Sequence, residues 1–151
     1  MKKMTIGDLI FILAKDLKVI LDHELKIKNM GFGQFKTLMI IHQQAVDGKL
    51  KQEKVAKKMN IHKSNVSRNI AKLREHNYIE LQPDETNEKN NNILLTDFAN
   101  KEIGDLVSIL QNVSKNMTKG ISESQLTITK DCLEKMMENI KVTGKEMRIK
   151  I

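Results

Sequence analysis

Apolar residues spaced three and four positions apart predict a long first helix. The pattern starts after Thr5-Ile6-Gly7-Asp8, where a hydroxyl and a carboxylate three residues apart are typical of a helix N-terminus. Met30-Gly31-Phe32-Gly33 interrupts the pattern, and a second, mostly buried helix is expected from about Phe35 until shortly before Asp47. The first helix reaches about Ile27, and its apolar face consists of Ile6, Leu9, Ile10, Leu13, Leu17, Ile20, Leu21 and Leu25.

Residues 52–58 and 63–76 predict two further helices joined by a short turn. In the first of them Val55 and Ala56, with Met59 just after it, share one side, and Asn60 suits a left-handed turn residue. The second helix has an apolar stripe, and Asn77 stands where a helix-ending Gly or Asn is expected. Two helices joined by three or four residues have the layout of a helix-turn-helix. The stripe of the second helix consists of Val66, Ile70 and Leu73.

The period then changes from helical to alternating. Residues 78–82 and 93–96 predict two short strands, with Pro83 ending the first and the polar residues 84–92 forming a long exposed tip. A hairpin directly after a helix-turn-helix is a wing. Thr96 is placed to cap a helix over about 97–117, and Ser122-Glu123-Ser124-Gln125 is a capping box that opens a last helix. The sequence thus predicts a mainly α (α+β) winged helix-turn-helix flanked by N- and C-terminal helices.

Basic residues gather in one part of the chain. The net charge is +7, from 26 basic and 19 acidic residues. Residues 51–77 carry eight basic and two acidic side chains, whereas residues 78–96 carry one basic and four acidic. This distribution favours a polyanionic partner for the two short helices, with a solvated lysine-rich face as the alternative. Aromatic residues make up only 3% of the chain, which argues against binding of single-stranded nucleic acid by stacking.

Residue types that carry chemistry are sparse. The single cysteine, Cys132, excludes an intramolecular disulfide, and we expect it to be a small core residue of a protein in the reducing cytoplasm. No run approaches the roughly 20 apolar residues of a membrane span. No nucleophile–base pair, carboxylate dyad or phosphate loop is visible, so we expect no enzyme, no catalytic residue and no cofactor. The histidines are scattered, and no metal site is expected: His23, His42, His62 and His76.

Four short motifs in register, within a stretch from about Phe32 to Leu110, resemble the MarR family of winged helix-turn-helix transcriptional regulators. Residues 55–61 resemble its Leu-Ala-x-x-Leu-Gly pattern, and residues 64–68 are similar to its Ser-Thr-Val-Thr-Arg recognition-helix start. Residues 73–79 resemble Leu-Glu-x-x-Gly-Leu-Val with Asn77 for Gly, and Leu95-Thr96 matches the close of the wing. The resemblance implies a bacterial, DNA-binding protein, most simply a repressor.

The residues between 57 and 72 suit double-stranded DNA. Short polar side chains and arginine at the N-terminal end of a helix are the groups that read base edges in the major groove. Arg68 suits guanine, Asn65 suits adenine, and Ser64 has N-capping as an alternative role. The expected base contacts are Ser64, Asn65, Ser67 and Arg68. The expected phosphate contacts, which position the protein without reading sequence, are Lys57, Lys58, Lys63 and Lys72.

Two positions depart from the family pattern. Many members carry Asp-x-Arg at the wing tip, where this chain has Asn87-Glu88-Lys89. Because lysine lacks the planar fork of arginine, we expect a weaker wing contact from Lys89 and Asn90, with a solvated loop tip as the alternative. Lys51 replaces the usual Ser or Thr cap, which adds a charge within reach of phosphate.

The terminal helices have more apolar surface than a winged helix needs. Residues 1–30 and 98–151 are therefore expected to form a helical dimerisation region around a DNA-binding domain at 31–97, and a symmetric homodimer reads an inverted repeat. The resemblance also implies a pocket for a small aromatic or lipophilic ligand, with core packing as the alternative role of its residues. A protein–protein module without specific DNA binding is the other function left open. The candidate pocket residues are Met30, Phe32, Phe35 and Met39.

Overall fold

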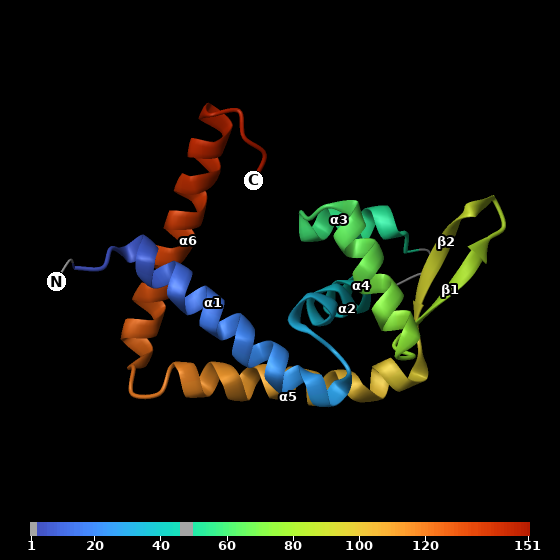
Figure 1. Cartoon of the computed structure of the whole chain (residues 1–151), viewed down its shortest axis with the longest axis horizontal. Coiled ribbons are helices and arrows are strands. Elements are labelled where there is room, and N and C mark those ends of the chain that lie inside the picture. Colours follow the sequence, from blue (N-terminus) through green and yellow to red (C-terminus); the bar gives the residue numbers. More distant parts are fainter. Residues whose placement is uncertain (1–2, 46–49) are drawn as a thin grey trace. The chain divides into compact units, whose positions relative to one another are not determined.

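The computed structural model describes residues 3–45 and 50–151, apart from the side chains of residues 87–90. Residues 1–113 and 114–151 form two compact units. The predicted mainly α fold with a two-stranded wing is confirmed. In chain order (Figure 1) the elements are α1 (Ile6–Leu25), the 3-10 turn η1 (Lys26–Lys28), α2 (Phe32–Gln44), α3 (Gln52–Met59), α4 (Lys63–Glu75), β1 (Ile79–Asp84), β2 (Asn87–Leu95), α5 (Asp97–Met117) and α6 (Glu123–Glu146).

Local signals place most of the helix ends. At the start of α1, Thr5 Oγ1 accepts from the Asp8 N–H at 3.1 Å, while Asp8 Oδ2 accepts from the Thr5 N–H at 2.8 Å. Ser122 and Gln125 form the same reciprocal pair ahead of α6. Beyond α3 and α4, Asn60 and Asn77 have φ of 51° and 64°. Both capping boxes and both left-handed asparagines are therefore confirmed.

The second helix starts earlier than expected. α2 begins at Phe32, because the first N–H groups of the helix find acceptors: the Gly31 N–H donates to Gln34 Oε1 and the Phe32 N–H donates to Asp22 Oδ1, both at 2.8 Å. A Cβ at Gly31 would lie 2.7 Å from Gln34 Oε1. Gly31 thus begins the helix. The predicted break after the first helix is present, but Phe32 and Gly33, which were expected to lie in the break, belong to α2.

The wing is longer and its turn shorter than the sequence suggested. β1 and β2 are antiparallel, with Ile79 opposite Leu95 and Leu81 opposite Ile93, and only residues 85–86 form the turn. Pro83 lies at a register irregularity inside β1, where its missing N–H is tolerated. The predictions that Pro83 ends the strand and that residues 84–92 form a loop were wrong. Beyond Leu81 and Ile93 the paired residues of the wing are polar, so backbone pairing there proceeds without apolar alternation.

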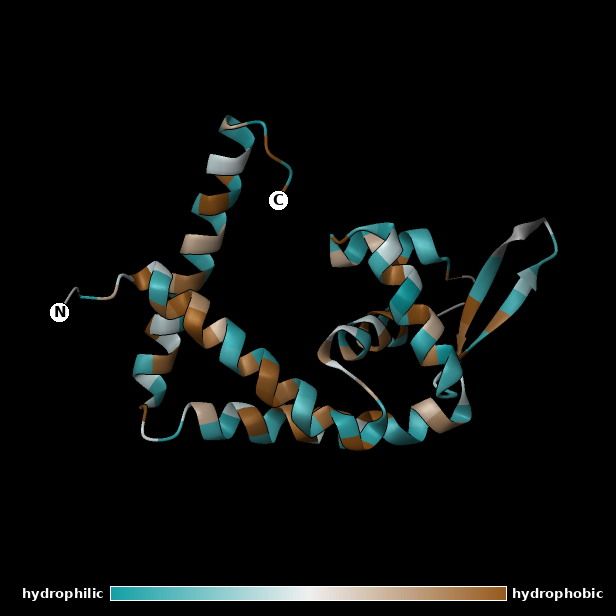
Figure 2. Ribbon diagram, in the orientation of Figure 1, coloured by the Kyte–Doolittle hydropathy of each residue, from teal (hydrophilic) through white to brown (hydrophobic). Residues whose placement is uncertain are grey.

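The main core lies in the unit 1–113, where α2 packs against α1, α3 and α4. By contrast, α1 and α6 each carry exposed apolar side chains, such as Phe11, 79% exposed, and Ile140, 63% exposed. Figure 2 shows these apolar bands along both helices. No helix in the described part of the chain is long and apolar enough to cross a membrane. Residues with at most 2% exposure in the core are Leu25, Leu38, Ile41, Leu50, Val55, Val66, Leu73, Tyr78, Ile79, Ile93, Ala99 and Leu106.

Candidate nucleic-acid interface

One side of α4 faces solvent because its opposite side is fully buried. The predicted stripe of Val66, Ile70 and Leu73 is at most 3% exposed. Successive residues of a helix are about 100° apart around its axis, so the buried stripe leaves the opposite half of the α4 surface facing solvent. All four predicted base-reading residues are exposed on that half. The structure thus brings Ser64, Asn65, Ser67 and Arg68 together on one exposed face of α4.

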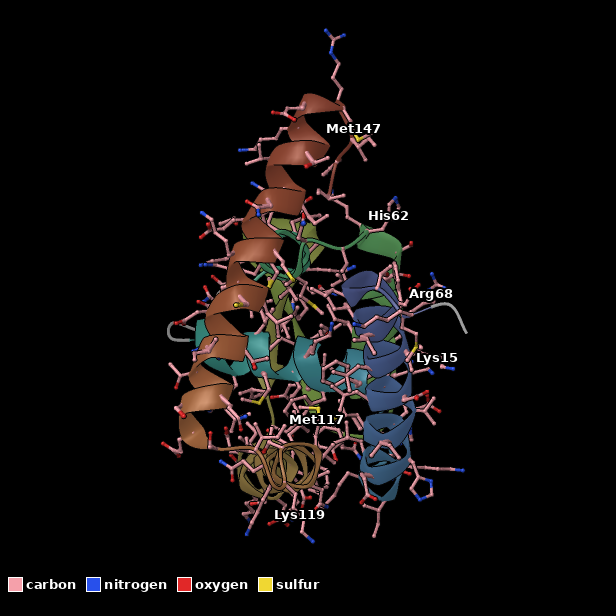
Figure 3. The ribbon with its side chains drawn as sticks, turned by 90° about the vertical axis from the view of Figure 1, so that its left-hand side faces the viewer. Lys15, His62, Arg68, Met117, Lys119 and Met147 are labelled. Atoms are coloured by element: carbon pink, nitrogen blue, oxygen red, sulfur yellow. The ribbon has the colours of Figure 1, made fainter. Side chains whose placement is uncertain are left out.

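The N-terminus of α4 is capped by a residue that the sequence did not indicate. His62 is the N-cap, and its Nδ1 accepts from the Ser64 N–H at 3.3 Å and lies 2.9 Å from Ser64 Oγ. The N-capping role considered for Ser64 is therefore wrong, since Ser64 lies inside the helix. Histidine is an uncommon N-cap, so composition gave no signal for it. Figure 3 shows His62 and Arg68 with their side chains.

Arg68 is held against its own helix. Its Nη2 donates to Asn65 Oδ1 at 2.7 Å, and its Nε donates more weakly to the Ser64 carbonyl at 3.4 Å. The first contact is short because the donor is charged. Two of the predicted base-reading residues are thus joined to each other in the free protein.

A polar cluster that sequence reasoning missed fixes α4 against α2. Asn69 Nδ2 donates to Thr37 Oγ1 at 3.0 Å, and Asn69 Oδ1 accepts from Gln34 Nε2 at 3.0 Å. Thr37 is 0% exposed, and its hydroxyl donates to the Gly33 carbonyl at 2.9 Å. Buried polar groups need partners of this kind, so Asn69 sets the rotation of α4 about its axis. A lone Asn among the polar residues of a helix carries no sequence signal for such a role.

The predicted phosphate-contacting lysines lie around the exposed face of α4. Lys57 and Lys58 end α3, and both are exposed, as is Lys72 on α4. Lys63 is also exposed, and its Nζ is 3.5 Å from Glu53 Oε1, an ion pair too solvated to hold the side chain firmly. These four cations remain available to a polyanion beside the base-reading face.

Lys51 is engaged within the protein. We expected its charge to face phosphate, but its ammonium forms a short ion pair with Asp84 of β1. This contact, together with the Thr86 N–H and hydroxyl, lowers the pKa of Asp84 to about 2. Lys51 thereby fastens the start of α3 to the wing. The other wing candidates, Lys89 and Asn90, belong to β2, and their side chains lie outside the described residues.

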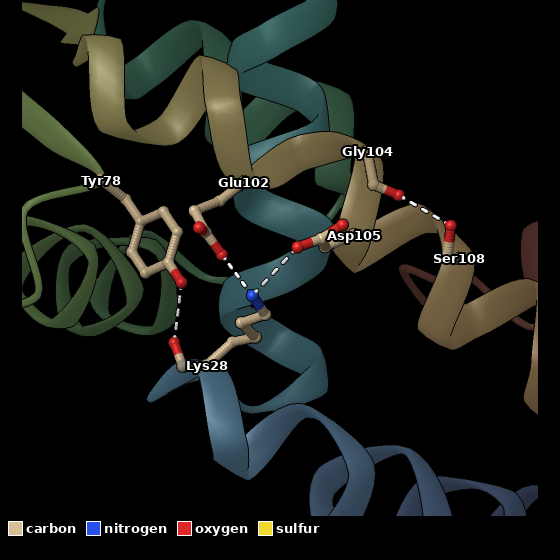
Figure 4. A network of polar contacts seen from close by, with 6 residues as sticks. All are labelled: Lys28, Tyr78, Glu102, Gly104, Asp105 and Ser108. Carbon is tan, nitrogen blue, oxygen red and sulfur yellow. Dashed lines mark hydrogen bonds and ion pairs between the residues drawn. The ribbon is translucent and has the colours of Figure 1, made fainter.

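A second polar cluster joins η1, the base of the wing and α5 (Figure 4). Lys28 Nζ lies 2.6 Å from Glu102 Oε2 and 3.3 Å from Asp105 Oδ2, and these two carboxylates raise the pKa of Lys28. The Tyr78 hydroxyl donates to the Lys28 carbonyl at 2.8 Å, and burial raises the pKa of that phenol. The wing base is thus tied to both neighbouring segments.

The candidate ligand residues are largely core. Met30 and Phe35 are 5% and 6% exposed, while Phe32 and Met39 pack against the same core at its edge. Met30 also lines a cavity of about 270 Å³ whose other walls are mostly polar, including Asp22, Lys72 and His76. The apolar cluster and this polar cavity meet only at Met30, so a lipophilic pocket stays a prediction.

The remaining candidates for chemistry give no cluster. Cys132 is exposed on α6, so its predicted place in the core was wrong; α6 as a whole buries little beyond Gly144. Among the described residues, no three His, Cys, Asp or Glu side chains come together as a metal site would need. The exposed face of α4 is therefore the best-formed candidate site.

The fold and this face of α4 define a winged helix-turn-helix protein. Residues 33–90, the central part of the chain, match the model of the MarR family. MarR-family proteins are transcription regulators and not enzymes. No curated protein gives a significant match.

Solved structures share the fold over most of the chain. The S. aureus MepR–DNA complex has 23% identity and a TM-score of 0.80, over 91% of this chain and 99% of that one. A SlyA-like transcription regulator from Listeria monocytogenes has 25% identity and a TM-score of 0.76, over 97% and 95%. A mutant MarR from E. coli complexed with operator DNA has 17% identity and a TM-score of 0.73, over 86% and 91%.

Proposed function

We propose that this protein is a DNA-binding transcriptional regulator that binds an inverted-repeat operator as a homodimer and represses transcription. The exposed polar face of α4, set opposite a buried apolar stripe and flanked by exposed lysines, is the observation that carries the proposal. The family match and the DNA complexes among the similar structures support it.

The geometry suits the major groove of B-DNA, which admits one helix. In this proposal the N-terminal half of α4 enters the groove, so that Ser64, Ser67 and Arg68 approach base edges. Lys57, Lys58, Lys63 and Lys72 contact the phosphates on either side, and Lys89 and Asn90 of the wing approach the adjoining backbone or minor groove. The phosphate contacts give affinity and salt dependence, while the base contacts give specificity.

The homodimer rests on apolar surface at both ends of the chain. α1 exposes Phe11 at 79% and Val19 at 62%, and α6 exposes Met137 at 60% and Ile140 at 63%. Exposed apolar surface of this extent marks an interaction site, and we assign it to a second copy of the chain. The dimerisation region is proposed to comprise 1–30 and 98–151, with the DNA-binding domain at 31–97. The two recognition helices would then lie about 34–36 Å apart, one turn of DNA.

Repression follows most simply from blocking a promoter in the bacterial cytoplasm. Release by a small aromatic or lipophilic ligand is part of the proposal, with Met30, Phe32, Phe35 and Met39 as its pocket. Such a ligand would have to bind the free dimer more tightly than the DNA-bound one, because only a difference in affinity shifts the equilibrium.

Paired substitutions test the assignment of DNA contacts. A duplex selected from a random pool by the full-length protein would be compared with a scrambled duplex by fluorescence anisotropy at several salt concentrations. We expect Arg68→Ala to weaken binding of the selected duplex by about 10- to 100-fold and of the scrambled duplex far less, because it removes a base contact. Lys58→Ala should weaken both equally and reduce the salt slope by about one. If the wild-type protein binds no duplex at low salt, the proposed function is wrong and a protein–protein module takes its place.

A further inference from the structure

The free protein already uses part of the hydrogen-bonding capacity of its base-reading residues. Arg68 has five N–H donors, carried by Nε, Nη1 and Nη2. Nε and one N–H of Nη2 point along one edge of the guanidinium, and that edge faces Ser64 and Asn65 of the same helix. The end edge, formed by Nη1 and the other N–H of Nη2, remains for an external acceptor pair.

Asn65 is constrained by the same contact. A guanidinium carries no acceptor, so the amide atom 2.7 Å from Arg68 Nη2 must be the oxygen. The Nδ2 donors of Asn65 and one lone pair of its oxygen are then left. Bidentate recognition of adenine requires an amide oxygen for N6 and an amide nitrogen for N7 together. In this arrangement Oδ1 of Asn65 is already bonded to Arg68, so bidentate recognition of adenine would have to share that oxygen or give up the contact with Arg68.

Asn65 supplies the side-chain acceptor that the structure shows for Arg68, and the Ser64 carbonyl supplies a weaker backbone acceptor. Lys72, one turn further along, offers only donors. Asn69 is turned toward α2, where its amide is bonded to Gln34 and Thr37. Asn65 is therefore the main side-chain contact that orients Arg68.

We propose, on the basis of the function proposed above, that Asn65 is a positioning residue that presents the end edge of Arg68 to guanine in each half-site. Guanine is the base whose major-groove edge offers two acceptors, O6 and N7, to such a fork. A side chain fixed before binding loses less conformational freedom on binding. Asn65 thus raises the preference for guanine without touching that base.

Selection of preferred duplexes from a random pool tests this role. The full-length wild-type protein, Asn65→Ala, Asn65→Asp and Arg68→Ala would each be used, with thermal unfolding to establish that every variant folds. The deciding quantity is the ratio of affinities for two duplexes that differ only by G·C or A·T at the position Arg68 reads. A purely structural role for Asn65 would change both affinities and leave their ratio alone.

We expect the wild type to select one invariant guanine per half-site and Arg68→Ala to lose that preference. Asn65→Ala should lower the guanine-to-adenine ratio by about tenfold, the equivalent of one hydrogen bond to a charged group. Asn65→Asp should retain the ratio, because its carboxylate still accepts from Arg68, although the added negative charge weakens overall affinity for DNA.

Two results would overturn the proposal. One is an unchanged guanine ratio in Asn65→Ala together with the loss of an adenine preference at a neighbouring position, which would make Asn65 a base reader. The other is the absence of any selected sequence for the wild type, which would remove the proposed function as well. The first result leaves the proposed function standing, so the two failures are distinguishable.

Discussion

The winged helix and the terminal helices of this chain treat their apolar residues in opposite ways. In the winged helix, Val55, Val66 and Leu73 are at most 1% exposed, and the helices and wing close their own core. In α1 and α6, Phe11, Leu133 and Ile140 are between 41% and 79% exposed. Both regions have helical apolar periodicity in the sequence. Periodicity alone therefore does not distinguish a helix whose apolar face is buried within its own chain from one whose apolar face is exposed.

The difference teaches where the stability of the chain is located. A core that is complete within one chain contributes a free energy of unfolding that does not depend on protein concentration. An apolar face that is covered by a second copy is stabilised by dimerisation, so its contribution to stability does depend on protein concentration. Substitutions in the two regions should accordingly differ in their concentration dependence as well as in size. The predictions that follow use this difference, beginning with the largest effect.

Ile140→Asp, a substitution in the exposed apolar face of α6, should have the largest effect. A charge on the exposed apolar face of α6 would have to be buried in the dimer, so we expect dimerisation to weaken by about 10- to 100-fold, measured by analytical ultracentrifugation. DNA affinity should fall with it, because the two half-sites would no longer bind as one unit.

The matched control for Ile140→Asp is Thr127→Asp, which puts the same charge on the polar side of α6, where Thr127 is exposed. This variant should remain as dimeric as the wild type. Equal dimerisation by Ile140→Asp and wild type would show that the apolar face of α6 does not bind the second copy.

Asn69→Ala tests the winged helix, whose core is complete within one chain, and should have an intermediate effect. It removes the donor to the fully buried Thr37 oxygen and the acceptor of Gln34 Nε2, at a cost of about 1–3 kcal/mol in the free energy of unfolding. Urea denaturation at two protein concentrations should give the same loss at both. The control Asn100→Ala removes an exposed amide on α5 and should change little. A loss that varied with protein concentration would show that the core of the winged helix is not complete within one chain.

Asp84→Asn, at the edge of the winged helix where the wing meets α3, should have the smallest effect. The folded pKa of about 2 lies below the ordinary value of 3.8, so the carboxylate stabilises the folded state fully above about pH 4. That contribution is lost as pH falls from about 4 toward 2. The difference in unfolding free energy between wild type and Asp84→Asn, followed by urea denaturation, should therefore shrink over this range. The control is Glu85→Gln in the adjacent turn. A difference in unfolding free energy between wild type and Asp84→Asn that stays constant down to pH 2 would refute the role of the ion pair.

Features that depend on a few neighbouring residues were predictable from the sequence. The capping boxes at Thr5 and Ser122 and the left-handed conformations of Asn60 and Asn77 are local, and each was predicted. The buried stripe of α4 was also predictable, since its three members share one side of a helix. Locating that stripe was enough to place the four base-reading candidates on the exposed face.

Features that depend on contacts between distant residues were not predictable. Lys51 and Asp84 are 33 positions apart, and Lys28 and Glu102 are 74 apart, so no local pattern pairs them. Asn69 has the same residue type whether it faces solvent or α2. The wing was misjudged because Pro83 and the polar residues after it are typical of loops, while backbone pairing with the opposite strand overrides that preference.

The wing has a further consequence for how the protein avoids self-association in crowded solution. A two-stranded sheet has unpaired backbone groups along both outer edges, which invite strand addition by another molecule. One edge is partly covered, because the Ile93 N–H donates to the Leu50 carbonyl at 2.8 Å. On β1, Pro83 offers no N–H and lies at the register irregularity, and Glu80 adds exposed negative charge, as does Glu85 in the adjoining turn. The irregular strand β1 thereby makes a poor template for aggregation.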